Sequence, residues 1–182
     1  KTKIQTEIFA VRFKPLAIEL LENINLKSLL NSSTYLSTDF IGIDNLAFDN
    51  FKDFCRHIEN YLQNRIEKRK TVDDLKIRLF NEIYKKEVFN VREISEKVFW
   101  TSRQINRYFN LIFGISLKEY LNILRCNQTY KDISNNKLSP QSKYFDQSHF
   151  IKEIKKYTGV TPTELNKNKN DRFLQLSTIK EI

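Results

Sequence analysis

Most of the chain repeats its apolar residues every three or four positions, which is the spacing of one face of an α-helix. Over residues 48–70 the apolar positions at this spacing are Phe51, Phe54, Ile58, Tyr61, Leu62 and Ile66. They predict one long amphipathic helix, and residues 16–24 predict a shorter one. Only three Gly and three Pro interrupt the 182 residues, so the sequence predicts a mainly all-α fold.

One short segment follows a different period. Between residues 7 and 13 apolar side chains alternate across an extended chain, with Phe9, Val11 and Phe13 on one face. This alternation predicts a short N-terminal strand that ends at Pro15, because proline has no backbone donor. Residues 1–70 are therefore expected to form a partial regulatory or linker region made of a strand and helices.

After residue 70 the helices predicted by the pattern become shorter. Residues 72–83 predict a first helix, and residues 90–98 predict a second. Asn90 is suited to cap the second helix, with Glu93 in the position of a capping-box partner. Ile94 and Val98 continue its apolar face.

A third short helix follows a turn at residues 99–101. Thr101 is expected to cap it, Ile105 and Phe109 to be buried, and Gly114 to end it. Two short helices joined by about three residues form a helix-turn-helix pattern, here at about 90–114. Residues 116–133 then predict a longer linker helix.

The helix at 101–114 recurs 45 residues later, in DQSHFIKEIKKYTGV at 146–160. The matched pairs are Thr101 with Asp146, Ile105 with Phe150, Arg107 with Lys152, Phe109 with Ile154 and Gly114 with Gly159. Cap, buried positions, basic position and terminal glycine keep one register, which predicts a second helix-turn-helix at about 138–160 and a tail at 166–182. The aromatic residues Trp100, Phe145 and Phe150 are expected to pack in the core.

The repeat fails upstream of residue 144. Ile94 and Val98 of the first copy fall opposite Ser139 and Lys143, and Pro140 lies between them. The segment NNKLSPQSK cannot form an equivalent amphipathic helix. We therefore expect only a shortened or irregular support before the second helix of the repeat.

Charge adds a candidate partner to this picture. The net charge is +9, and residues 101–172 carry 13 Lys and Arg against six Asp and Glu. A basic excess confined to one segment favours a polyanion such as nucleic acid.

Several other classes of protein find no support in the sequence. No run of about 18 apolar residues predicts a membrane span. Cys55 and Cys126 lack metal-ligand or redox spacing, which predicts two ordinary thiols in a reducing compartment. No phosphate-binding glycine loop, close carboxylate pair or nucleophile motif is present, so we expect no enzyme, no metal site and no cofactor.

Two stretches resemble the DNA-binding domain of the AraC/XylS family of bacterial transcription regulators. They are ISEKVFWTSRQINRYFNLIFGISLKEYLNILR at 94–125 and YFDQSHFIKEIKKYTGVTPTEL at 144–165. The resemblance implies two helix-turn-helix subdomains joined by a linker helix within residues 71–182. It further implies that the helices at 101–114 and 146–160, termed the reading helices below, enter successive major grooves of double-stranded DNA.

Residue chemistry selects the candidate DNA contacts on these helices. Arg pairs with guanine, and Gln or Asn pairs with adenine, whereas Lys more often contacts phosphate. The candidates are Arg103, Gln104, Asn106 and Arg107 on the first helix, and Gln147, Ser148, His149, Lys152, Lys155 and Lys156 on the second.

The resemblance also suggests partners beyond DNA. It implies a cytoplasmic activator at the bacterial nucleoid that contacts RNA polymerase and senses a small-molecule effector through a missing N-terminal region, and it leaves open whether the chain forms a homodimer. The sequence alone does not decide between activation and repression. The alternative is a helical protein-interaction module whose second helix-turn-helix is degenerate and does not read DNA.

Overall fold

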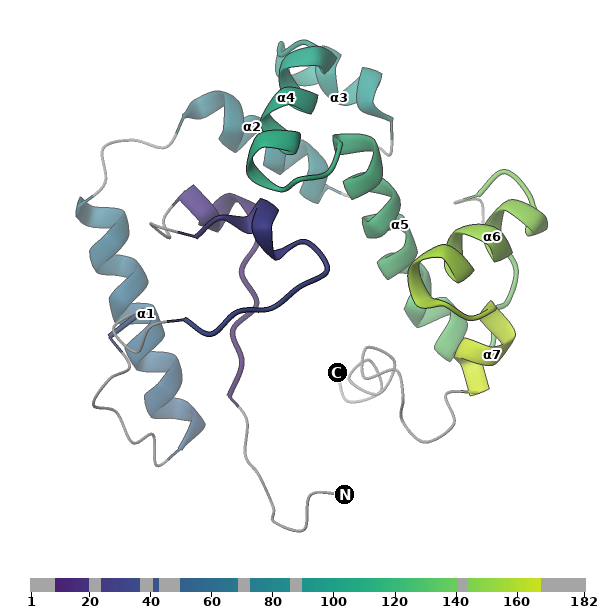
Figure 1. The fold of residues 1–182 in the computed structure, drawn as a ribbon, viewed down its shortest axis with the longest axis horizontal. Helices are drawn as coiled ribbons and strands as arrows, with labels where there is room; N and C mark the ends of the chain where they lie inside the picture. The colour runs from purple at the N-terminus through teal and green to yellow at the C-terminus, as the bar shows by residue number, and fades with distance from the viewer. Residues whose placement is uncertain are drawn as a thin grey trace.

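The computed structural model describes residues 9–19, 24–36, 41–42, 50–68, 73–85, 90–140 and 144–167. Their helices are the 3-10 helices η1 (Pro15–Glu19) and η2 (Leu26–Leu29) and the α-helices α1 (Phe51–Lys68), α2 (Asp74–Tyr84), α3 (Val91–Val98), α4 (Ser102–Ile112), α5 (Leu117–Ser134), α6 (Gln147–Thr158) and α7 (Pro162–Lys167). No strand occurs in these ranges. The predicted mainly all-α fold is confirmed (Figure 1).

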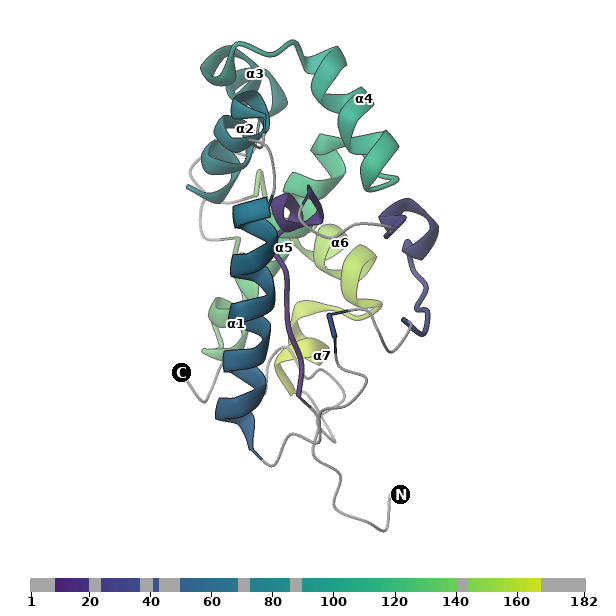
Figure 2. The same ribbon diagram turned by 90° about the vertical axis from the view of Figure 1, so that its left-hand side faces the viewer.

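The predicted N-terminal strand is wrong for the part of 7–13 that the structure describes. Residues 9–14 are not a strand, and no strand elsewhere in the described ranges pairs with them. Phe9 packs on α1 instead, with its ring centroid 5.9 Å from Phe51 and 5.3 Å from Phe54. Figure 2 shows this segment running beside α1. Because the apolar side chains bury against a helix, the alternation does not require a sheet; residues 7 and 8 lie outside the description.

The sequence pattern predicted two helices within residues 1–70, and it located one of them better than the other. The long helix expected over 48–70 is α1, and Asn50 caps it by accepting from the Asp53 N–H at 3.0 Å. The helix expected over 16–24 is shorter, because η1 ends at Glu19 and Ile24 is not helical. Residues 69–72, where we predicted the boundary between two regions, lie outside the described ranges.

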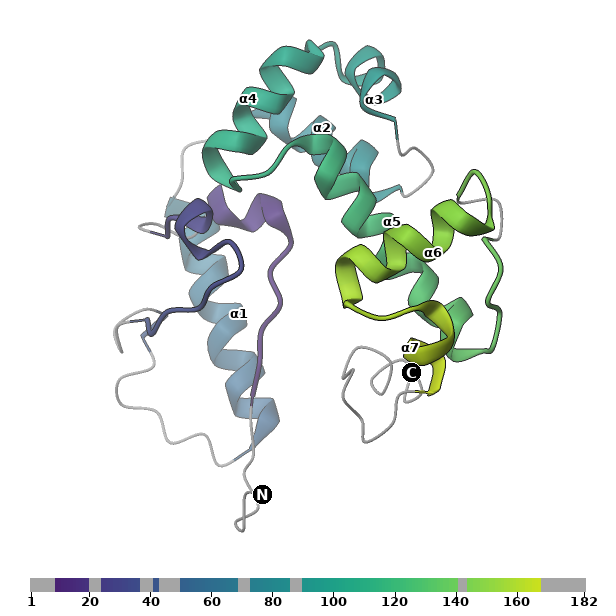
Figure 3. The same cartoon turned by 45° about the vertical axis from the view of Figure 1, so that its right-hand side comes forward.

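Two apolar cores lie along α5. The first is formed by α2, α3, α4 and the first half of α5, and its fully buried aromatic residues are Phe80 and Phe109. The second is formed by the last half of α5 with α6 and α7, around Phe150 and Ile154. Figure 3 shows α4 and α6 at opposite ends of α5. One continuous helix therefore carries both.

The 45-residue repeat keeps its register in three dimensions. Thr101 and Asp146 are the N-caps of α4 and α6. The buried positions Ile105, Phe109, Phe150 and Ile154 are each at most 1% exposed. Gly114 and Gly159 end their helical segments with φ angles of 73° and 78°, a left-handed conformation that favours glycine.

The second copy differs where the sequence predicted that it would. Helix α3 precedes α4, whereas residues 138–140 and 144–146 before α6 contain no helix. Tyr144 takes over part of the support: it is 7% exposed and packs edge-on against Phe150, with ring centroids 5.1 Å apart. The Arg125 guanidinium of α5 lies 5.9 Å from the centre of the Tyr144 ring. In the second copy the Tyr144 side chain thus packs against α6, whereas in the first copy helix α3 packs against α4.

Candidate nucleic-acid interface

The first turn of α4 is held by a reciprocal cap. The Gln104 N–H donates to Thr101 Oγ1 at 3.3 Å, and the Thr101 N–H donates to Gln104 Oε1 at 3.1 Å. The Thr101 hydroxyl also lies 2.6 Å from Gln104 Oε1. This capping box fixes the start of the helix. The side chain of Gln104 remains exposed, with its oxygen committed to the cap.

Arg103 and Arg107 occupy the exposed face of the same helix. Both side chains are exposed, opposite the buried stripe of Ile105 and Phe109. Neither guanidinium has a hydrogen-bond or ion-pair partner within the described part of the chain. Two uncommitted guanidinium groups beside a helix N-terminus form a surface suited to an anionic partner.

Asn106 has a different position from its neighbours. It is half-buried, and its Oδ1 accepts a hydrogen bond from the Leu117 N–H at 3.1 Å. Leu117 is the first residue of α5, where backbone N–H groups lack partners within the helix. Asn106 therefore joins α4 to α5 through its side-chain oxygen.

We predict that Asn106→Ala lowers the free energy of unfolding by about 1–3 kcal/mol, because it leaves the buried Leu117 N–H without its acceptor. Urea unfolding followed by circular dichroism measures the change. Asn110→Ala is the matched control, since Asn110 is exposed on the same helix. Equal stability of the two variants would contradict the role of Asn106.

The first turn of α6 is capped by Asp146. Its carboxylate accepts from the His149 N–H at 2.7 Å. Gln147 donates from Nε2 to the Leu138 carbonyl at 2.9 Å, which ties the preceding loop to the helix. Ser148, Lys152 and Lys155 are exposed, so this helix also presents polar and basic groups near its start and along its length.

Like Gln147, the candidates His149 and Lys156 of α6 have contacts inside the fold. The half-buried His149 ring lies edge-on to Tyr144, with centroids 5.7 Å apart, and its Nδ1 is buried without a hydrogen-bond partner among the described residues. Lys156 Nζ lies 3.5 Å from Glu119 Oε1 of α5 and 3.3 Å from the Tyr157 hydroxyl. The hydrogen bond with Tyr157 raises the pKa of Lys156. Lys156 is thus an exposed cation that also links α6 to α5.

The three aromatic residues predicted to pack in the core, Trp100, Phe145 and Phe150, differ in exposure. The prediction of core packing is confirmed for Phe150, at 1% exposed, and Trp100 is half-buried with its ring 5.7 Å from Tyr108. It is wrong for Phe145, which is 93% exposed. Tyr144, one position earlier, is buried instead, because the loop before α6 is irregular and turns this residue toward α5.

Phe99 is also exposed, and its backbone is strained. It ends α3 with a φ of 56° and a ψ of 36°, and its N–H donates to the Ser95 carbonyl. This left-handed conformation costs a residue with a Cβ about 1–2 kcal/mol, which is why glycine usually occupies it. The Phe99 side chain is 85% exposed, so the cost is not offset by burial. Nothing in the sequence pattern distinguished Phe99 from Trp100.

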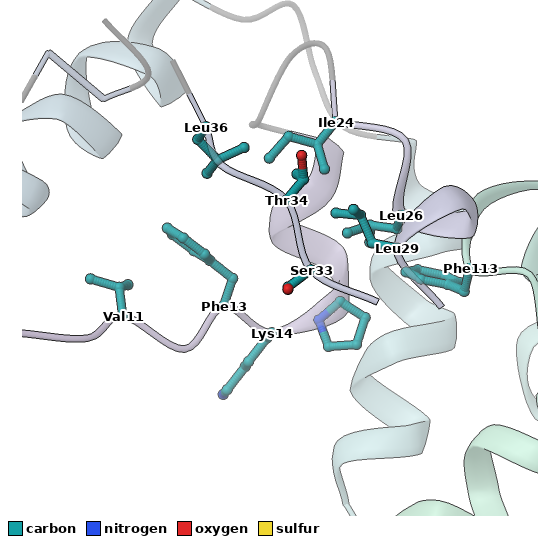
Figure 4. A pocket seen from close by; sticks show the side chains of 11 residues that line it. Val11, Phe13, Lys14, Ile24, Leu26, Leu29, Ser33, Thr34, Leu36 and Phe113 are labelled. Atoms are coloured by element: carbon teal, nitrogen blue, oxygen red, sulfur yellow. The ribbon is translucent and has the colours of Figure 1, made fainter. Parts of the chain in front are cut away.

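A pocket lies between the N-terminal segment and the first core (Figure 4). Its volume is about 490 Å³, and it is lined by Val11, Phe13, Lys14, Pro15, Ile24, Leu26, Leu29, Ser33, Thr34, Leu36 and Phe113. Phe113 is the C-cap of α4, and its ring lies 5.1 Å from that of Phe109. The pocket therefore joins the N-terminal segment to the end of the first reading helix at Phe113.

The described residues also bear on metal binding, thiol chemistry and membrane insertion. No group of three or more His, Cys, Asp or Glu side chains is placed to hold a metal ion there. Cys55 and Cys126 are free thiols, and burial raises the pKa of Cys126. Among the described helices, none is long and apolar enough to cross a membrane.

Comparison with known families identifies the class of this region. Residues 94–168 match the family model of a helix-turn-helix domain. The matched segment runs from α3 to α7, and this part of the chain is similar to a DNA-binding helix-turn-helix domain of the AraC type. Comparisons with curated proteins and with solved structures gave no match.

Proposed function

We propose that this chain is a sequence-specific regulator of transcription that inserts α4 and α6 into successive major grooves of double-stranded DNA. The observation that carries the proposal is the first two turns of α4, where Arg103 and Arg107 are exposed and have no hydrogen-bond or ion-pair partner among the described residues. A helix N-terminus directs unpaired backbone N–H groups toward phosphate and side chains toward base edges.

The spacing of the two helices supports binding by both. They lie at opposite ends of α5, which has 18 residues and is about 27 Å long at 1.5 Å per residue. One turn of DNA is about 34 Å, so a rigid spacer of this length is of the right order to place two helices in neighbouring grooves.

The contacts inside the fold divide the candidate residues by role. Arg103 and Arg107 are the proposed base-reading residues of α4, with the amide nitrogen of Gln104 beside them. On α6 we assign base reading to Ser148 and Lys152, and phosphate contact to Lys155. Gln147, His149 and Lys156 have the internal contacts described above, so each would act on DNA from a fixed position.

We predict that Arg103→Ala and Arg107→Ala each weaken binding to a selected DNA site by about 1–3 kcal/mol and relax the base preference at one position. The site would come from a selection of bound genomic fragments, with affinity measured by fluorescence anisotropy. Lys155→Ala should instead weaken all sequences alike and reduce the slope of log affinity against log salt by about one.

The control for this prediction is Arg56→Ala. Arg56 is exposed on α1, and its guanidinium pairs with Asp53 at 3.2 Å, away from both reading helices. Binding that tolerates Arg103→Ala and Arg107→Ala as well as Arg56→Ala would contradict the proposed reading face of α4.

A protein-interaction module is the second candidate function. The observation that favours it is the loop before α6, where the described residues contain no support helix. In that case the unaltered chain would bind no duplex DNA, even at low salt. Contact with RNA polymerase and response to an effector remain predictions from the resemblance, and the division at residue 70 remains a prediction from the sequence pattern.

A further inference from the structure

We propose that Phe99 and Phe145 are DNA contacts, each placing its ring against thymine methyl groups at the edge of the bases that α4 and α6 read. This inference rests on the proposed function. The two side chains are 85% and 93% exposed, although both residues are large and apolar. Their immediate neighbours Trp100 and Tyr144 pack into the fold, so burial was available to an aromatic residue at each place.

Phe99 gives the stronger indication of a role outside the chain. Its position requires a left-handed backbone to end α3 and start the turn into α4, and glycine adopts that backbone without strain. The aromatic side chain is neither buried nor needed for the cap, because the cap uses only its backbone N–H. Strain that nothing in the fold offsets is typical of functional positions.

The position of both residues selects DNA as the partner. Phe99 lies two residues before the cap Thr101, and Phe145 lies directly before the cap Asp146. Both therefore accompany the helix ends that would enter the groove. The exposed residues close to them in sequence are polar or basic, including Arg103, Gln147 and Ser148, whereas a protein partner of ordinary composition would need a continuous apolar patch.

The chemistry of the major groove then selects the contact. Thymine presents the one methyl group among the four bases there, and an aromatic side chain can pack against it. An exposed Phe beside a reading helix would add a preference for thymine at the flank of each half-site. Aromatic residues before both helices would do so twice, once at the start of each reading helix.

The test combines protein variants with altered DNA. The variants are Phe99→Gly and Phe145→Ser, and the matched control is Leu111→Ser, which changes an exposed apolar side chain (69%) near the end of α4 remote from its cap. Each is titrated with a duplex obtained by selection with the unaltered chain, and with the same duplex carrying uracil for thymine at the flanks. Uracil removes only the methyl group.

We expect each Phe variant to bind the thymine duplex about five- to tenfold more weakly and the uracil duplex as well as the unaltered chain does. Leu111→Ser should bind both as the unaltered chain does. Phe99→Gly should also melt several degrees higher, because glycine relieves the strained backbone, so weaker binding cannot be attributed to misfolding.

Two results would overturn the inference while leaving the proposed function intact. One is unchanged affinity of both variants for the thymine duplex, and the other is an equal loss on the thymine and uracil duplexes. Failure of the unaltered chain to bind any duplex at low salt would instead reject the proposed function, and the inference with it.

Discussion

Tyr144→Ala is expected to lower the free energy of unfolding of the second core by about 3 kcal/mol or more and to loosen the attachment of α6. The Tyr144 ring is 7% exposed and contacts Phe150, His149 and Arg125. Truncation of a buried aromatic side chain costs about 3–5 kcal/mol, because packing is lost and a cavity remains. Residues 138–140 and 144–146, directly before α6, contain no helix that could replace this packing.

Denaturant unfolding and amide hydrogen exchange would measure this effect. Protection should fall first in α6 and α7, whereas the amides of α4 should be less affected. Phe145→Ala is a closely matched control, since the adjacent ring is 93% exposed and its removal should change stability by less than about 0.5 kcal/mol. Similar effects for the two variants would show that Tyr144 does not support the helix.

Tyr144→Phe separates the ring from its hydroxyl. Burial raises the pKa of Tyr144, so the hydroxyl stays neutral at physiological pH and contributes no charge to the packing. We therefore expect Tyr144→Phe to retain most of the stability that Tyr144→Ala loses.

The second large effect is expected for Phe109→Ala, which should destabilise the first core by about 3–5 kcal/mol. Phe109 is fully buried, and its ring centroid lies 5.8 Å from Phe80, 5.1 Å from Phe113 and 5.5 Å from Tyr120. These rings come from α2, the end of α4 and α5, so the substitution removes the common contact of three segments.

Thermal and urea unfolding would measure the loss, with Leu111→Ala as the control on the same helix. Leu111 is 69% exposed, so its truncation should be nearly neutral. DNA affinity should fall with Phe109→Ala only as far as the folded population falls. A change below about 1 kcal/mol would mean that the aromatic cluster repacks around the gap.

Features that depend on local sequence were predictable. Helix periodicity located α1 to α6, and the caps Asn90, Thr101 and Asp146 are those that the sequence indicated. The reason is that a cap bonds within three residues of itself, so its chemistry is contained in a short stretch. The buried stripe of each reading helix followed from the same spacing.

Features that depend on contacts between residues distant in sequence were not predictable. The exchange of Tyr144 for Phe145 as the buried ring depends on how the irregular loop meets α5, and Asn106 depends on a bond to Leu117, 11 residues away. The alternation at residues 9–13 reflects packing on α1, whose residues lie some 40 positions later. Periodicity reports that a side is apolar, but not which surface will cover it.

The continuity of α5 limits how the two cores can move. Leu124 packs against the first core and Cys126 belongs to the second, so a single residue separates their contacts on this helix. A hinge needs a stretch whose dihedral angles can change without breaking packing on either side, and α5 offers none. The rotational phase between α4 and α6 is thus set by the helical screw itself, at about 100° per residue. If both helices bind DNA as proposed, the chain would accept only pairs of half-sites whose relative rotation about the DNA axis matches that of α4 and α6.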